Sequence, residues 1–205
     1  MRGARHTRLR AATVESHDAL DRAVGAAGYF GSRDGYGRYL AKMHAFHNAF
    51  DPRALRIDEA LCRAFEVDRH AGWLEEDLAA LGLALPVVSA PDSGTLDATS
   101  VVLDPKHGDT ITCRSGLFGA LYVLTGSSLG ARLLVKWADA LPLPVDRGRC
   151  YLGTLSRSTV WPRFLHAIEQ DDAIDDVLMV RGAVAAFDCV RAHLQATNVR
   201  EEANA

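Results

Sequence analysis

Hydrophobic positions along most of the chain recur every three or four residues, which is the period of an amphipathic α-helix. In the first such segment, residues 8–25, the pattern runs through Leu9, Thr13, Ser16/His17, Leu20 and Val24. The same spacing predicts further helices over residues 34–50, 56–81 and 112–140, and two more within residues 155–196. No convincing run of strand-like alternation interrupts them, so the expected fold is all-α, in a single domain.

Glycine and proline mark the expected boundaries of these helices. The segment GYFGSRDG ends the first helix, Pro52 ends the second, and the third is expected to break near Gly72 and to end with Gly82 as its cap. Residues 84–111 hold three prolines and two glycines without a helical period, so we expect a long connection there. The expected organisation is a helical domain over residues 8–196 with flexible tails at residues 1–7 and 197–205.

Composition narrows the class of protein that these helices build. The chain has 205 residues, of which 48% are hydrophobic and 24% charged, and its formal net charge is −3. A charge so close to zero argues against general nucleic-acid binding, which needs a strongly cationic surface. No apolar run follows the basic N-terminus, and the apolar stretch at residues 116–125 is too short to span a membrane. We therefore expect a cytoplasmic protein without a membrane partner.

The cysteines and most histidines argue against the commonest metal centres. The four cysteines are far apart and form no CxxC pair, which disfavours structural zinc and a redox-active dithiol. His44 and His47 are three residues apart, but the chain has no Glu-x-x-His pair, and this argues against a di-iron carboxylate bundle.

The helix predicted over residues 112–140 is unusually rich in glycine. It contains Gly116, Gly119, Gly126 and Gly130, each of which costs roughly 1 kcal/mol relative to alanine inside a helix. Such a cost is accepted where something approaches the backbone closely. Two interpretations remain open: a close helix–helix contact through small residues, or a bare backbone face that covers a flat ligand, with a kink at TGSSLG.

A second unusual feature is His17, which falls on the apolar stripe of the first helix. A lone histidine there is commonly a core residue, but two neighbours favour a ligand. Asp21 lies one turn later and can hold the second imidazole nitrogen, as a metal-bound histidine requires. Arg10 lies two turns earlier and can meet an anionic group of the same ligand.

Three segments together resemble the heme oxygenase family. LRAATVESHDALD (residues 9–21) resembles its proximal helix, GALYVLTGSSLGARLL (119–134) its distal helix, and DRHAGWLEEDLAALG (68–82) a segment of the bacterial branch that accompanies bacteriophytochromes. Their order and spacing agree over most of residues 8–195. The resemblance implies a single-domain, heme-oxygenase-like multihelical bundle.

The resemblance also implies roles for individual residues. His17 would be the axial iron ligand, Asp21 its acidic neighbour, and Arg10 the partner of a heme propionate. The backbone of Gly126 and Gly130 would lie over the heme face. Arg163 lies in the helix that usually supplies another propionate partner.

Three positions depart from the family pattern. Ser127 stands where animal-type enzymes have an aspartate, and the phytochrome-associated branch shares this serine. Ala131 replaces the second glycine of a Gly-Gly pair, and Thr125 stands where most of the branch has glutamate. The resemblance implies that Ser127, Gly126 and Gly130 take part in heme ring opening. The three changes therefore bear on the rate and regiochemistry of that reaction more than on the fold.

The chemistry implied by the resemblance is the opening of heme b, which serves as both cofactor and substrate, to biliverdin, carbon monoxide and ferrous iron. Electrons would come from an external ferredoxin, flavodoxin or reductase, because the chain has no Gly-x-Gly-x-x-Gly dinucleotide motif. A bacteriophytochrome that receives biliverdin is the implied partner, and iron acquisition is the other physiological use. Two alternatives stay open: heme binding without turnover, and a helical regulatory module without heme in which His17 is a core residue.

Overall fold

The computed structural model describes residues 3–50, 58–86, 111 and 113–196, and every regular element within these ranges is a helix. The elements are α1 (Ala4–Ala26), α2 (Arg33–Ala49), α3 (Glu59–Ala64), the 3-10 turn η1 (Val67–Arg69), α4 (His70–Ala80), α6 (Arg114–Asp139), α7 (Cys150–Arg157), α8 (Val160–Gln170) and α9 (Asp176–Gln195). The prediction of an all-α fold is therefore confirmed.

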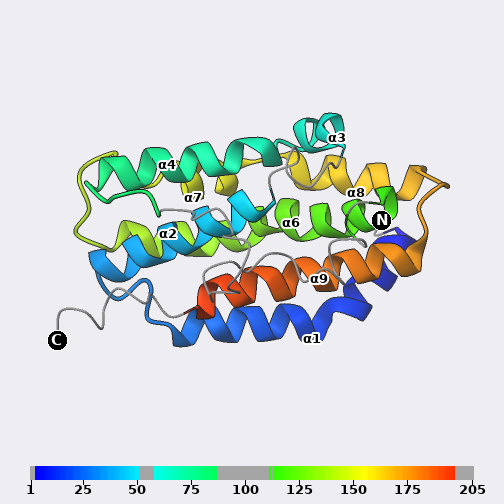
Figure 1. Ribbon diagram of the computed structural model, residues 1–205, viewed down its shortest axis with the longest axis horizontal. Coiled ribbons are helices and arrows are strands. Elements are labelled where there is room, and N and C mark those ends of the chain that lie inside the picture. The colour runs from blue at the N-terminus through cyan, green and yellow to red at the C-terminus, as the bar shows by residue number, and fades with distance from the viewer. Residues whose placement is uncertain (1–2, 51–57, 87–110, 112, 197–205) are drawn as a thin grey trace, which may run out of the picture.

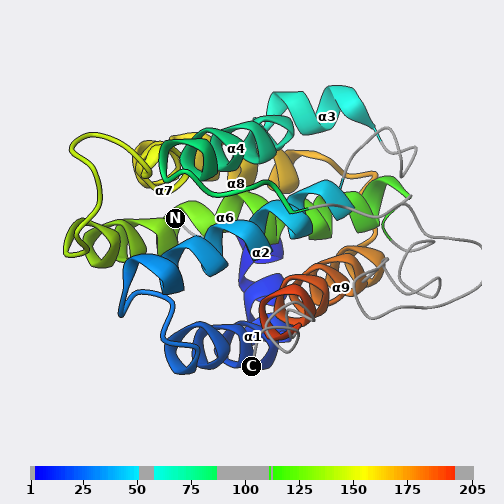
Figure 2. The ribbon, with the colours of Figure 1, turned by 60° about the vertical axis from the view of Figure 1, so that its left-hand side comes forward.

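Helix α6 lies in the middle of the bundle and packs directly on α9, α7 and α8. Figure 1 shows α4, α7 and α8 along one side of α6, with α9 and α1 along the other; Figure 2 shows the same order after rotation. The most extensive packing joins α6 to α9, followed by α6 to α7 and α1 to α9. The first helix thus packs on α9 rather than along the length of α6.

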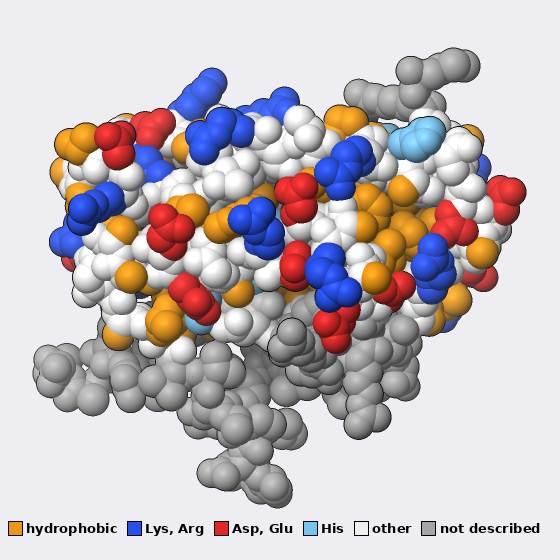
Figure 3. Space-filling view, turned by 90° about the horizontal axis from the view of Figure 1, so that it is seen from above, with side chains coloured by type: hydrophobic (Ala, Val, Ile, Leu, Met, Phe, Trp, Pro, Cys, Tyr) orange, Lys and Arg blue, Asp and Glu red, His pale blue; other side chains and the backbone are white. Residues whose placement is uncertain are grey.

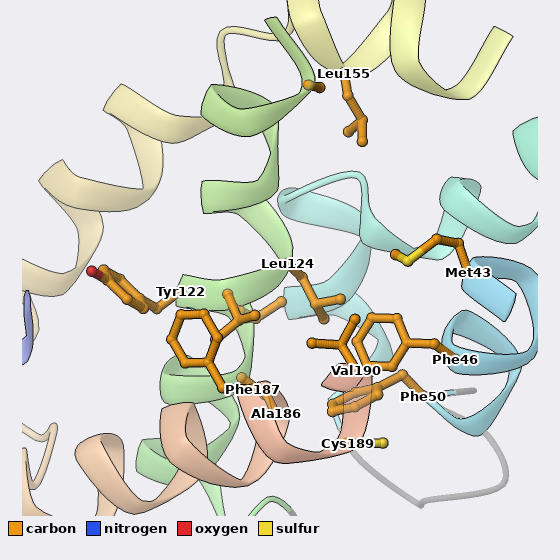
Figure 4. Close-up of a cluster of buried hydrophobic side chains, with 14 of the residues drawn as sticks. Met43, Phe46, Phe50, Tyr122, Leu124, Leu155, Ala186, Phe187, Cys189 and Val190 are labelled. Atoms are coloured by element: carbon orange, nitrogen blue, oxygen red, sulfur yellow. The ribbon is translucent and has the colours of Figure 1, made fainter. Parts of the chain in front are cut away.

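Burial of apolar side chains holds these layers together. Figure 4 shows one part of the core, in which Phe46 of α2, Leu124 of α6 and Val190 of α9 point toward one another, with Phe50 beside them. Helix α6 is long and apolar enough to cross a membrane by length and composition, but half of its apolar window is buried within the bundle. That burial is typical of the central helix of a helical domain.

The surface balances charges locally. On the face shown in Figure 3, basic and acidic side chains are interspersed, and apolar side chains gather in a limited area between them. This mixture matches the formal net charge of −3 for the whole chain.

Helix α1 begins four residues before its expected start, so residues 4–7 are not part of a flexible tail. Glu169 of α8 accepts hydrogen bonds from the backbone N–H groups of Arg5, at 3.3 Å, and His6, at 2.8 Å. The Arg5 guanidinium lies 2.7 Å from Asp176 of α9 and also donates to the Ile168 carbonyl. The first turn is stabilised by partners more than 160 residues away, which no local pattern reveals.

The third predicted helix breaks at a different place from the one expected. The chain interrupts the helix at Phe65 and Glu66, where Glu66 adopts a left-handed φ of 61°, while Gly72 lies inside α4. Gly82 has a φ of 68° directly after α4, which confirms the predicted glycine cap. Most of the expected connection at residues 84–111 lies outside the described residues.

Three helices, rather than two, follow residue 149. The additional helix is α7, whose first turn is capped from a distance: the carboxylate of Asp77 in α4 accepts the backbone N–H of Cys150 at 2.6 Å and of Tyr151 at 2.9 Å. Arg149, the N-cap residue just before the helix, supplies no side-chain hydrogen bond. The sequence therefore shows no start signal for α7 where one would be sought.

Candidate functional site

The glycines in the first half of α6 serve helix packing. A Cβ atom on Gly119 would lie 1.9 Å from the carbonyl oxygen of Met179 in α9, and one on Gly182 would lie 2.0 Å from the carbonyl oxygen of Gly116. Neither position tolerates a side chain unless the two backbones separate. The close-contact interpretation is therefore correct for the crossing of α6 and α9.

The glycines in the second half of α6 have different surroundings. A Cβ atom on Gly126 would lie 3.3 Å from Cζ3 of Trp161, so the indole of α8 covers this glycine. A Cβ atom on Gly130 would meet nothing within 4 Å. Gly130 is thus an open position, and α6 continues as one helix through TGSSLG.

An apolar stripe flanks Gly130 and faces solvent. Leu129, Leu133 and Trp137 recur every four residues along α6, and their exposed fractions are 46%, 51% and 40%. Large apolar side chains exposed in a row mark a surface that binds something. The bare-backbone interpretation therefore stays a prediction for this end of the helix, supported by an open glycine beside exposed apolar side chains.

His17 is not a core histidine. Its side chain is 57% exposed, and its Nδ1 lies 3.2 Å from Oδ2 of Asp21, as the spacing predicted. The imidazole contacts the ring of Phe187 in α9 edge-on, with a centroid distance of 5.9 Å. Since Asp21 engages Nδ1, Nε2 is the nitrogen that can ligate a metal.

His17 shares its face of α1 with three other exposed residues. Arg10 and Val14 precede it and Asp21 follows it at helical spacing, and Val14 is 51% exposed. The apolar stripe of α1 is buried only nearer its start, at His6, Leu9 and Thr13. The expectation that His17 belongs to the buried stripe was therefore wrong, and its exposure favours a ligand.

Contacts near the start of α1 and just beyond its end place His17 level with the open part of α6. Near the start of α1, the ring of His6 lies 6.3 Å from that of Tyr122, and the Tyr122 hydroxyl hydrogen-bonds Thr13. Beyond its end, Phe30 contacts Trp137 at 5.7 Å. The two helices run in the same direction (Figure 1), so His17 lies level with the part of α6 that includes Gly130. We call His17, Gly130, Val14, Leu129, Leu133 and Trp137 the α1–α6 surface.

Tyr122 is a site residue that the spacing argument missed. Burial raises the pKa of its phenol, whereas the hydrogen bond to Thr13 and the positive charge of Arg10 lower it. Arg10 thus lies on the part of α1 that is near Tyr122 of α6. The segment Tyr-Val-x-x-Gly within the distal-helix motif was the available signal.

Ser127 and Ala131 are not turned toward the α1–α6 surface. The Ser127 hydroxyl donates to the carbonyl of Leu124 in its own helix at 2.6 Å. Ala131 is only 1% exposed, so its methyl group packs into the bundle. The replacement of a glycine by Ala131 therefore fills core space instead of crowding the open face around Gly130.

Arg163 lies apart from the other predicted residues. Its guanidinium lies 3.4 Å from the carboxylate of Glu66 and also donates to the carbonyl of Ala64. On α8 it follows Trp161 by two residues and so points to another side of the helix. The structure places Arg10, His17 and Asp21 on one face of α1, level with Gly130, whereas Arg163 pairs with Glu66.

The other histidines and Ser128 do not form a catalytic centre. His47 Nε2 lies 3.0 Å from the Tyr151 hydroxyl, and burial lowers the pKa of His70 to about 3. Residues 126–130 spell Gly-Ser-Ser-Leu-Gly, the order of a hydrolase nucleophile elbow, but Ser128 is buried in mid-helix instead of lying at a strand-to-helix turn. Among the described residues, no group of three or more His, Cys, Asp or Glu could hold a metal ion.

Comparison with known proteins gives one curated relative of known activity. No protein-family model matches the chain. The chain is 30% identical over 194 residues to heme oxygenase PigA of Pseudomonas aeruginosa, and the match covers 90% of this chain and 88% of the relative. The similarity thus extends over nearly the full length of both proteins.

Proposed function

Because the chain belongs to the heme oxygenase family, we propose that it opens heme b with dioxygen and external electrons to give biliverdin, carbon monoxide and ferrous iron. The observation that carries the proposal is the position of His17. Its imidazole is exposed, its Nδ1 is held by Asp21, and it lies level with the only part of α6 where a described glycine faces open space. Heme iron would take one such nitrogen from the protein as its ligand.

The residues of the α1–α6 surface fit this group. His17 Nε2 would hold the iron, while Leu129, Leu133 and Trp137 would cover the apolar macrocycle and lose their exposure to water. Gly130 allows close approach because it has no side chain. Arg10, at the earlier end of the same α1 face, would pair with a propionate.

The protein's contribution to the chemistry is to orient the heme and to exclude water from it. Heme supplies the dioxygen-binding iron and is itself the molecule oxidised. Asp21 accepts a hydrogen bond from the Nδ1–H of His17, which fixes the tautomer and leaves Nε2 free to act as a ligand. Gly130 leaves space for the ring beside α6, whereas the Trp161 indole covers Gly126, and the apolar stripe would exclude water.

Electron supply and product use are further parts of the proposal. The described residues show helices only, without the strand-turn-helix unit of a dinucleotide site, which supports an external ferredoxin, flavodoxin or reductase as donor. We propose a cytoplasmic location and delivery of biliverdin to a bacteriophytochrome. The support for this delivery is the segment LEEDLAALG, which resembles the corresponding segment of the phytochrome-associated branch.

The test is a visible spectrum of the purified protein after addition of one equivalent of hemin and then ascorbate in air, with catalase present. We expect a Soret band that decays while a broad red absorption grows. His17→Ala should abolish the complex, and His166→Ala, which removes another exposed histidine, should leave it intact. If His17→Ala forms the same complex, His17 is not the ligand.

Heme binding without turnover is the second candidate. Ser127 favours it, since its hydroxyl donates to the Leu124 carbonyl and so is not directed at a ligand over α6. This function predicts a Soret band that persists under reductant in air. A protein that shows no Soret shift at all would instead be a helical module that does not bind heme.

A further inference from the structure

A small cavity lies on the opposite side of α6 from the α1–α6 surface. It is lined by residues of α6, α4, α7 and α8 and of the turns before η1 and after α7. It holds roughly 220 Å³ of space unfilled by atoms, part of it open to solvent. The space in it that a water molecule can enter is enough for about one water. The cavity is therefore too small for a substrate.

Two buried polar atoms in the cavity wall have no partner among the described residues. They are Ser128 Oγ and His70 Nδ1, on side chains that are 2% and 3% exposed. An unpaired buried hydroxyl or imidazole nitrogen is costly, and natural proteins satisfy such groups with protein or ordered water. Two unsatisfied groups in one wall call for a molecule that can both donate and accept.

We propose that Ser128 and His70 bind a buried water that bridges Oγ and Nδ1. Water fits because the space that it can enter is water-sized and the wall is polar at these two atoms, whereas an apolar gas would leave both atoms unpaired. Burial keeps His70 neutral, with a pKa of about 3, so either of its tautomers can share a hydrogen with the water.

The water would hold the weakest turn of α6 in place. In this turn Thr125 Oγ1 donates to the Leu121 carbonyl and Ser127 Oγ to the Leu124 carbonyl, a pattern that loosens a helix. Gly126 and Gly130 weaken it further. Ser128 and Gly130 lie on opposite sides of the same turn, so the bridge would fix the backbone that faces the heme. Ser128 and His70 are thus positioning residues, and this role rests on the proposed function.

The stability of the heme-free protein tests the water site without any heme chemistry. If water bridges the two residues, Ser128→Ala leaves the water and His70 with a lost partner. The melting temperature then falls, and the amide hydrogens of residues 126–131 exchange about fivefold faster. If the cavity is dry, the substitution removes an unpaired hydroxyl, and the melting temperature rises with no change in exchange, which overturns the proposal. Ser156→Ala is the control, because the hydrogen bond that Ser156 Oγ makes within the described part of the chain goes to the Gly153 carbonyl of its own helix.

The positioning role is tested separately on the hemin complex. We expect Ser128→Ala to change the ratio of biliverdin isomers while the hemin dissociation constant stays within about twofold of the original. An unchanged ratio in a destabilised variant would refute the positioning role. A destabilised variant of a protein that does not open heme would support the water site and refute the proposed function.

Discussion

Two glycine-to-alanine substitutions in α6 should change stability in opposite directions. Gly119 and Gly130 lie in the same helix, and alanine improves the helix propensity of either position by about 1 kcal/mol. Their surroundings differ: a Cβ atom on Gly119 lies 1.9 Å from the Met179 carbonyl oxygen and 2.6 Å from the Ala183 nitrogen, whereas one on Gly130 meets nothing within 4 Å. The tertiary contact therefore decides the sign.

The loss of folding stability expected for Gly119→Ala follows from the rigidity of both backbones. The obstructing atoms belong to the main chain of α9, so no side-chain rotation relieves the overlap and the helices must separate. Overpacking of this kind costs typically 1–3 kcal/mol, and we expect the upper end, about 3 kcal/mol. After the gain in propensity the net loss is ~2 kcal/mol, which lowers the melting temperature by about 4–8 °C in a domain of this size.

Gly130→Ala should raise the melting temperature of the heme-free protein by about 2–4 °C, since only the propensity term acts. The same methyl group lies on the α1–α6 surface, so hemin affinity and ring opening should fall. Thermal unfolding followed by circular dichroism, with and without hemin, measures both effects. Equal destabilisation by the two substitutions would refute the distinction between packing glycines and open glycines.

Three further substitutions test single contacts. Glu169→Ala removes the carboxylate that caps the first turn of α1, so differential scanning calorimetry should show a melting temperature lower by about 2–4 °C. Burial raises the pKa of Asp77 to about 6 from its usual 3.8, so the folded state binds the extra proton and this group stabilises the fold less as pH rises from 4 to 6. A melting-temperature profile over that range should therefore be flatter in Asp77→Asn than in the original protein, and parallel profiles would contradict this assignment. Arg10→Gln should weaken hemin binding about three- to tenfold in a titration of the Soret band, whereas Arg163→Gln should leave it unchanged because Arg163 pairs with Glu66.

Local interactions explain what could be predicted from sequence. The helical period identified the principal helices, because one face of each must be buried along its whole length. The cap at Gly82 and the pairing of His17 with Asp21 also follow from short spacing, since a left-handed cap and an i,i+4 contact involve neighbours on one helix. Family resemblance added the role of His17 as a ligand, which the spacing alone left open.

Contacts between distant segments decided the rest. Whether a glycine of α6 packs or stays open depends on where α9 and Trp161 approach, and the start of α1 depends on Glu169 in α8. Asp77 caps α7 across more than 70 residues, and Arg163 is drawn away from the site by Glu66. None of these partners is close in the chain, and hydrophobic periodicity and motif spacing do not report which distant segments come into contact. Sequence therefore determined the helices and the local pair at His17, whereas tertiary packing determined which side chains and which backbone remain free to bind a ligand.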